Sequence, residues 1–207
     1  MALARTVVAE GLIDELTRFE ELVRPLTSGQ WETPSRCDGW TVGDVARHVI
    51  GSMADVAAGR LDGLGTPEVT KREVDERAGR SPAELADECA EVTKAAAGML
   101  PLFDDAAWAG PGPGGFDGTL GDGVEALFYD TWMHAEDIRA ALGQTSVMSS
   151  GFGAARSHVA WDLRRVAQWK GEMPKADDAA YAFIMAATGR ADGSSFGADA
   201  PPNIYAA

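Results

Sequence analysis

Apolar residues recur at intervals of three and four along several stretches of the chain, which is the spacing of amphipathic helices. In residues 7–26 this stripe includes Leu12 and Phe19. After Thr41, a residue type suited to capping a helix N-terminus, a second stripe continues through Val49. We find no run of alternating apolar and polar positions that would predict a β-strand. The pattern therefore predicts an all-α protein.

Two further long helices have recognisable ends. Ser81 is followed three residues later by Glu84, the spacing of a capping box, and a helix is predicted over residues 82–100. A fourth helix is predicted over residues 120–142, where Gly143 suits the position just past a helix C-terminus. The sequence therefore predicts four long helices.

The remaining segments are shorter or irregular. Helices are predicted over residues 151–169 and 178–189. The charged stretch around Pro67 is expected to be a connector without regular structure. Residues 104–123 are rich in glycine and proline and are expected to form a long loop, either a wall of the functional site or a plain surface excursion.

Four long helices joined by loops are typical of an up-down four-helix bundle. We predict a metal-binding bundle over residues 1–145 and a C-terminal helical extension, with an irregular tail, packed on it over residues 146–207. In such bundles, ligand sites are built from side chains of facing helices. Functional residues are therefore expected among the polar residues that face the interior.

Three polar residues on the second and fourth predicted helices form a candidate metal site. Asp130 and His134 are four residues apart, so that both side chains can face one ion. His48 lies beside an apolar stripe and could supply a third ligand. Two imidazoles and a carboxylate suit a divalent ion, with zinc favoured and Ni, Fe, Co or Mn possible, and they leave coordination positions open. The residues alone leave open a metal-free bundle in which these three side chains hydrogen-bond one another.

Four other residues are secondary candidates. Asp137 could orient the ring of His134 or pair with a nearby arginine. Trp40 and Trp132 could line a pocket or fill the core. His158 has charged neighbours in the sequence and is expected to be an ordinary surface or packing histidine.

Composition narrows the possible partners. The chain of 207 residues has 18 Lys and Arg against 32 Asp and Glu, a net charge of −14, and no basic run, so nucleic acid is not expected as a partner. No apolar stretch is long enough to cross a membrane and the N-terminus does not resemble a signal peptide, so a cytoplasmic location is predicted. Cys37 and Cys89 lack metal-type spacing and are expected to be buried free thiols.

Two stretches, WETPSRCDGWTVGDVARHV and LFYDTWMHAEDIRAALG, resemble the signatures of the DinB-like superfamily, specifically its mycothiol-dependent maleylpyruvate isomerase branch. The tail ATGRADGSSFGADAPPNIYA also resembles that branch. The resemblance implies a four-helix bundle whose metal ligands match His48, Asp130 and His134. The branch has Glu where this chain has Asp130, which shortens the reach by one methylene. The isomerase branch also has a substantial domain after the bundle, whereas only about 60 residues follow Gly143 in this chain. A part of that domain is therefore expected to be lacking.

The function implied by this resemblance is that of a divalent-metal-dependent enzyme. A mycothiol-like thiol would be the cosubstrate, bound as a thiolate, and would add to an electrophilic small molecule in an isomerase or S-transferase reaction. The expected partners are thus small molecules, and the chain is expected to be a monomer or homodimer. The alternatives are a metal-dependent hydrolase, in which a metal-bound water replaces the thiol, and a non-catalytic metal-binding or stress-associated bundle protein.

Overall fold

Helices provide the regular secondary structure of the computed structural model, which describes residues 3–165 and 167–206. Over those ranges the structure contains isolated β-bridges but no strand, so the predicted all-α fold class is confirmed. The helices are α1 (Arg5–Val23), α2 (Ser28–Trp31), α3 (Val42–Ala57), α4 (Pro67–Asp75), α5 (Pro82–Met99), α6 (Asp105–Trp108), α7 (Leu120–Ala141), α8 (Ser150–Arg165) and α9 (Asp177–Ala187), with 3₁₀ turns at Leu100–Leu102, Pro113–Gly115 and Ser194–Asp199.

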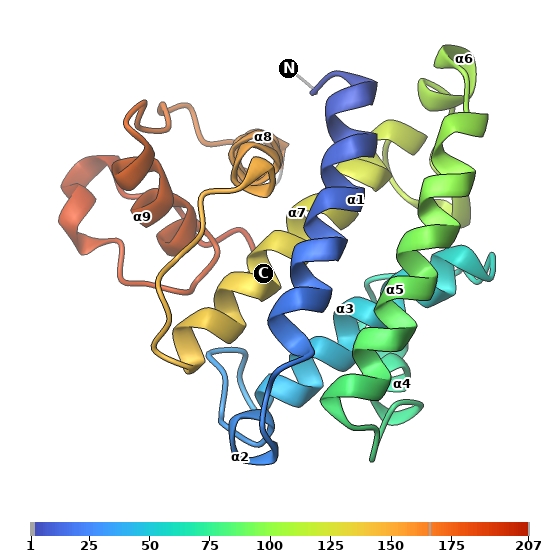
Figure 1. The fold of residues 1–207 in the computed structure, drawn as a ribbon. Coiled ribbons are helices and arrows are strands. Elements are labelled where there is room, and N and C mark those ends of the chain that lie inside the picture. The colour runs from blue at the N-terminus through green and yellow to red at the C-terminus, as the bar shows by residue number, and fades with distance from the viewer. Residues whose placement is uncertain (1–2, 166, 207) are drawn as a thin grey trace.

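The four longest segments of the bundle, α1, α3, α5 and α7, enclose a common interior (Figure 1). Helix α1 packs against α5 and α7, and α3 packs against the same two helices from the other side. Helix α4 covers α3, while α8 packs on α7 and α1 and in turn carries α9. This arrangement places the polar residues of α3 and α7 opposite each other.

One apolar cluster runs from the bundle into the C-terminal helices. It contains Phe128 and Trp132 of α7 together with Phe152 of α8 and Phe183 of α9, all buried. Gly151 allows close contact between α8 and α7, because a Cβ atom at that position would lie 2.5 Å from the Cβ of Trp132. The helices that follow residue 145 therefore share a core with the bundle.

The predicted helix ends agree with the structure where capping residues mark them. Helix α5 begins with a complete capping box between Ser81 and Glu84, and α3 begins in the same way at Thr41. Helix α7 also begins with a capping box, at Thr119, a signal that was not used to predict its start. Helix α8 ends at Arg165, earlier than the predicted residue 169. No described helix has both the length and the apolar character needed to span a membrane.

The stretch around Pro67 was expected to be an irregular connector, and this prediction is wrong. It forms α4, with Thr66 accepting a hydrogen bond from the Val69 backbone at its N-terminus. The only fully buried residue of α4 is Glu73, an acidic side chain. Hydrophobic periodicity could not reveal a helix whose buried contact is polar.

Replacing Ser81 by Ala is expected to lower the free energy of unfolding by about 1 kcal/mol, since the substitution leaves a backbone N–H of the first turn of α5 without its partner. Urea unfolding followed by circular dichroism measures the change. Ser28, which begins α2 but accepts no capping hydrogen bond there, provides a matched Ser→Ala control that should be close to neutral. Equal effects of the two substitutions would contradict the capping role.

Candidate metal centre

Two facing helices bring together the three residues predicted as metal ligands. Helix α3 supplies His48, and α7 supplies Asp130 and His134. The Nε2 atom of His48 lies 3.6 Å from Oδ2 of Asp130, and Nε2 of His134 lies 3.4 Å from Oδ1 of the same carboxylate. One ligand atom from each residue fits within a cluster no wider than 4.8 Å. The three side chains therefore point at a common position.

The opposite nitrogen of each imidazole is bound by another carboxylate. Nδ1 of His48 is 2.9 Å from Oε2 of Glu73, which also accepts a hydrogen bond from Ser52. Nδ1 of His134 is 2.8 Å from Oδ2 of Asp137. Because a carboxylate only accepts, each Nδ1 carries a proton, which leaves Nε2 as the nitrogen that could bind a metal ion. This is the arrangement that orients metal-binding histidines.

The donor set fits a divalent ion. Ligand atoms bound to a tetrahedral zinc ion at ~2.0–2.2 Å are about 3.4 Å apart, close to both of the observed nitrogen–oxygen separations. Without a metal ion, an imidazolium proton on Nε2 of His134 would take the position between the ring and Asp130, and a bound ion would replace that proton. The residues present therefore suit a metal ion, with His48, Asp130 and His134 as its ligands.

Electrostatics at the site favour positive charge. Burial opposes ionisation of Asp130, but His134 and then His48 outweigh it and lower the pKa of this carboxyl to about 2. Burial would lower the pKa of His134, yet Asp130 and Asp137 together raise it well above its ordinary value. Carboxylates that stabilise an imidazolium in this way would equally stabilise a bound cation.

Asp137 is the centre of a second cluster behind His134. Its side chain is fully buried, and Arg190 donates to both of its oxygens at 2.8 Å. Arg36 donates to Oδ1 at 2.6 Å. These partners hold the pKa of Asp137 well below its usual range despite burial, mainly through the hydrogen bond from Arg190. Of the two roles considered for Asp137, the structure shows both: it contacts the imidazole of His134, and its arginine partners come from distant segments.

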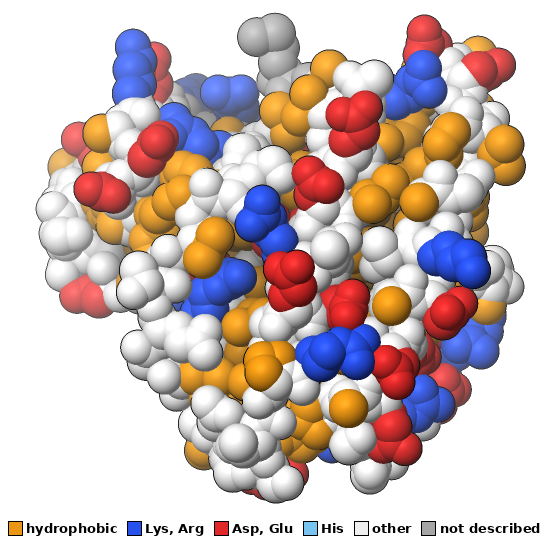
Figure 2. Space-filling view, in the orientation of Figure 1, with side chains coloured by type: hydrophobic (Ala, Val, Ile, Leu, Met, Phe, Trp, Pro, Cys, Tyr) orange, Lys and Arg blue, Asp and Glu red, His pale blue; other side chains and the backbone are white. Residues whose placement is uncertain are grey.

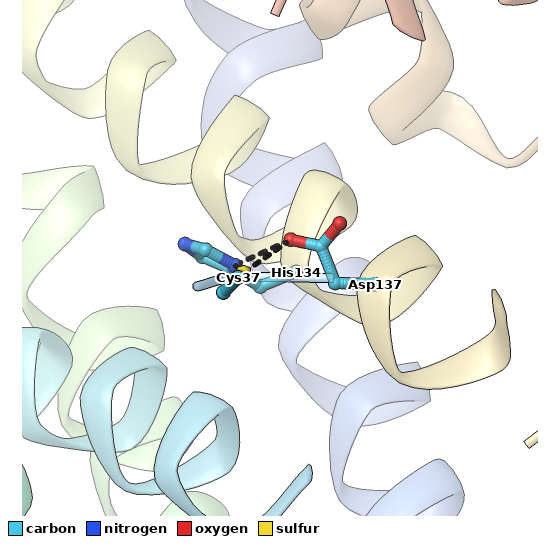
Figure 3. A group of neighbouring side chains, drawn as sticks. All are labelled: Cys37, His134 and Asp137. Carbon is cyan, nitrogen blue, oxygen red and sulfur yellow. Dashed lines mark hydrogen bonds and ion pairs between the residues drawn. The ribbon is translucent and has the colours of Figure 1, made fainter. Parts of the chain in front are cut away.

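Cys37 also reaches this cluster. Figure 3 shows its thiol and the imidazole of His134 both directed at Asp137, with Sγ donating to Oδ2 at 3.2 Å. Cys37, His134 and Asp137 thus form a second group of potential ligands. Both oxygens of Asp137 already accept hydrogen bonds from arginine, so this group is a poorer cation site than the one at Asp130. Both cysteines are free, but only Cys89 is fully buried, so the expectation of two buried thiols is wrong for Cys37.

A cavity of about 760 Å³ opens onto His48 and Asp130. Its volume is in the range of small-molecule sites. The walls come from α3, α5, α7 and the loop between α6 and α7, so the predicted long loop does form part of the wall. The tail residue Tyr205 contributes as well. Substrates could therefore reach the candidate metal position from this side.

The secondary candidates have different positions. Trp40 packs edge-on against His48, with ring centroids 5.4 Å apart, but it does not line the cavity. Trp132 is completely buried against Phe152 and donates its indole N–H to the backbone, so its role is packing. His158 was expected to be an ordinary surface or packing histidine. It lines the cavity and stacks on Tyr129, so it belongs to the site region.

Replacing Glu73 by Ala is expected to weaken metal binding about 10- to 100-fold, because His48 would lose the partner that fixes its ring and tautomer. Competition with a chelating dye measures the affinity. Glu73→Gln, which keeps the size and one acceptor oxygen, should retain more affinity than Glu73→Ala. Glu76 directly follows the last residue of α4 and is partly exposed, so Glu76→Ala serves as the control and should leave the metal affinity unchanged. Unchanged affinity in Glu73→Ala would contradict the orienting role.

The structure thus defines a class of protein, a helical bundle in which two histidines and a carboxylate from facing helices converge beside a cavity. Residues 12–139 match the family model described as the mycothiol maleylpyruvate isomerase N-terminal domain. The match covers more than half of the chain, and the protein belongs to this family. A comparison with curated proteins finds no match.

Two solved structures have a similar fold. The mycothiol-dependent maleylpyruvate isomerase superposes with a TM-score of 0.62 at 17% sequence identity, and its histidine-to-alanine mutant with 0.61 at 16%. In each case the match covers 96% of this chain and 95% of the other. The chain is therefore not shortened relative to the isomerase, and the expectation that a substantial part after the bundle is lacking is wrong. These similarities confirm the DinB-like bundle with additional C-terminal helices.

Proposed function

We propose that the protein is a divalent-metal-dependent enzyme that activates a low-molecular-weight thiol, of the mycothiol type, for addition to an electrophilic small molecule. The observation that carries this proposal is the convergence of both Nε2 atoms on Asp130 at the edge of a cavity. Membership of a family described by a mycothiol-dependent isomerase supports the choice of thiol. Zinc is the proposed ion, because imidazole and carboxylate ligands suit it and need no redox chemistry.

A zinc ion bound here would lower the pKa of a coordinated thiol, so that the thiolate is available at neutral pH. The protein residues would set the geometry. Glu73 and Asp137 hold the imidazoles of His48 and His134 so that their lone pairs face the ion. With three protein ligands, one coordination position remains for the thiol. The apolar walls of the cavity would limit access of water to the reacting atoms.

The thiolate would add to an electrophilic carbon of the second substrate held in the cavity. If the adduct rotates about the former double bond and then eliminates the thiol, the outcome is isomerisation. If the adduct leaves as a thioether, the outcome is S-transfer. Both belong to the proposal, and the products distinguish them: an isomer has the mass of its substrate, whereas a thioether has the summed mass.

The proposal is tested by incubating the zinc-loaded protein with mycothiol and diethyl maleate, an uncharged electrophile, and by following thiol loss and products by mass spectrometry. We expect turnover that is lost in His48→Ala and after chelation. Glu91→Ala, on the exposed side of α5, is the matched control and should keep full activity. Equal rates in the parent and in His48→Ala would contradict the proposal.

A further inference from the structure

The cavity next to the candidate metal centre has an unusual charge balance for a site that would accept an acidic substrate. Among the described residues that line it there is no lysine or arginine, and Asp130 is the only carboxylate. Most of the wall is apolar, with Met53, Leu100, Phe103 and Leu127 as examples. A carboxylate buried there would lose its hydration and find no guanidinium or ammonium partner in the wall.

The arginines of the neighbouring cluster do not change this picture. Arg36 and Arg190 are both bound to Asp137, on the Nδ1 side of His134, whereas the cavity opens on the side of Asp130. Neither arginine lines the cavity. Releasing either of them toward a substrate would break a buried ion pair with a carboxylate that is itself completely buried.

Two tyrosines are among the hydrogen-bonding residues of the wall, which also include Ser52, Thr66, Thr70 and His158. The hydroxyls of Tyr129 on α7 and Tyr205 in the tail are 2.8 Å apart, and both residues line the cavity. One hydroxyl must donate to the other, and the hydrogen of the second has no other partner among the described residues. The pair therefore has one donor to offer to an oxygen acceptor in the cavity.

We propose that the electrophilic substrate is an uncharged, mainly apolar molecule whose carbonyl oxygen accepts a hydrogen bond from the Tyr129 and Tyr205 pair, rather than a dicarboxylate. This inference rests on the proposed function, since it takes the occupant of the cavity to be the partner of the thiol. With an α,β-unsaturated ketone, the S–C bond forms at the β-carbon as the π pair moves to the carbonyl oxygen, and the proton lost by the thiol returns at the α-carbon. In this pose the tyrosine pair would donate to the oxygen that gains charge in this step.

Two unreactive probes of matched shape test the inference, 4-phenylbutan-2-one and 3-phenylpropanoate, which differ in a methyl ketone against a carboxylate. Binding to the full chain is measured by titration calorimetry in the presence of chelator, so that a metal ion cannot capture the carboxylate. We expect the ketone to bind at least ~10-fold more tightly, because the wall offers no compensation for a buried charge. Equal or tighter binding of the carboxylate, or no binding of either probe, would overturn the proposal.

Two conservative variants test the tyrosine donor. Tyr205→Phe should weaken binding of the ketone about three- to tenfold, the loss expected for one hydrogen bond. Tyr181→Phe is the matched control, because the Tyr181 hydroxyl bonds Ser146 and Glu136 and does not line the cavity. Unchanged affinity in Tyr205→Phe would overturn the assignment of the carbonyl contact.

The outcome is separable from that of the proposed function, because these titrations require neither metal nor turnover. A preference for the ketone in a protein that never binds metal would defeat the proposed function alone. A preference for the carboxylate in a protein that holds metal and consumes thiol would defeat the substrate inference alone.

Discussion

Replacing Asp137 by Ala is expected to destabilise the protein by about 3–5 kcal/mol, the cost of removing one partner from a buried ion pair. The substitution would leave Arg36 and Arg190 without the carboxylate that both of them bind, and His134 without its Nδ1 acceptor. The side chain of Asp137 is fully buried, so water cannot replace it without rearrangement. Chemical denaturation followed by circular dichroism measures the loss.

Asp87→Ala is the control for this prediction. Asp87 also pairs with an arginine, Arg24, but on the exposed surface of α5, where an ion pair contributes at most about 1 kcal/mol. The two substitutions remove the same chemical group and differ in burial. If Asp137→Ala were as stable as Asp87→Ala, the cluster would not have the structural importance that its geometry indicates.

Replacing Trp132 by Ala is expected to cost about 3–5 kcal/mol of stability while leaving metal binding intact. The indole is fully buried in the cluster shared by α7, α8 and α9, and it packs against Phe152 and Tyr181. It lies two residues before His134 but on another face of α7. Thermal unfolding measures the loss of stability, and elemental analysis of the folded variant measures its metal content.

Trp161→Ala provides the matched control, because this indole lies on the surface of α8 and is 36% exposed. Trp161 also contacts Arg165, and an exposed cation–π pair of this kind contributes ~0.5–1 kcal/mol. Apart from this contact, the loss of Trp161 should lower the stability by less than about 1 kcal/mol. A Trp132→Ala protein with normal stability but altered ligand binding would instead restore the pocket role considered for Trp132.

The long helices of the bundle could be predicted from the sequence because two independent signals agree. Apolar stripes at helical spacing mark α1 and α3, and α3 and α5 begin with predicted capping residues that the structure confirms. Helix α4 carries a cap and a proline at its start but almost no apolar stripe, and its buried residue is Glu73. Its existence depends on tertiary contacts with α3, which a single sequence does not display.

The candidate ligands could be predicted for a similar reason. Asp130 and His134 are four residues apart on one helix, so their spacing alone places both side chains on the same face. His48, from a helix far away in the sequence, was proposed from its position beside an apolar stripe, and the resemblance supported that choice. Glu73 and Tyr205 carry no such signal, because their positions depend on how α4 and the tail pack on the bundle. The only sequence signals near Glu73 were Thr66 and Pro67, a residue pair typical of a helix start, in a stretch interpreted as a connector.

The surface charge agrees with small-molecule partners. Figure 2 shows acidic and basic side chains interspersed over one face, with hydrophobic side chains between them and no continuous basic area on that face. The net charge of −14 gives general repulsion of polyanions. Within the cavity the same sign is concentrated in Asp130, where it favours a cation.

The central claim, that His48, Asp130 and His134 form a metal centre, is tested most directly by elemental analysis of the full chain purified without chelator and loaded with zinc. The account predicts about one equivalent of metal in the parent protein, lost in His48→Ala and in His134→Ala, with Cys89→Ala retaining it as the control because Cys89 is buried away from the site. A folded parent that holds no metal even after zinc is supplied, or a His48→Ala variant that holds a full equivalent, would contradict it.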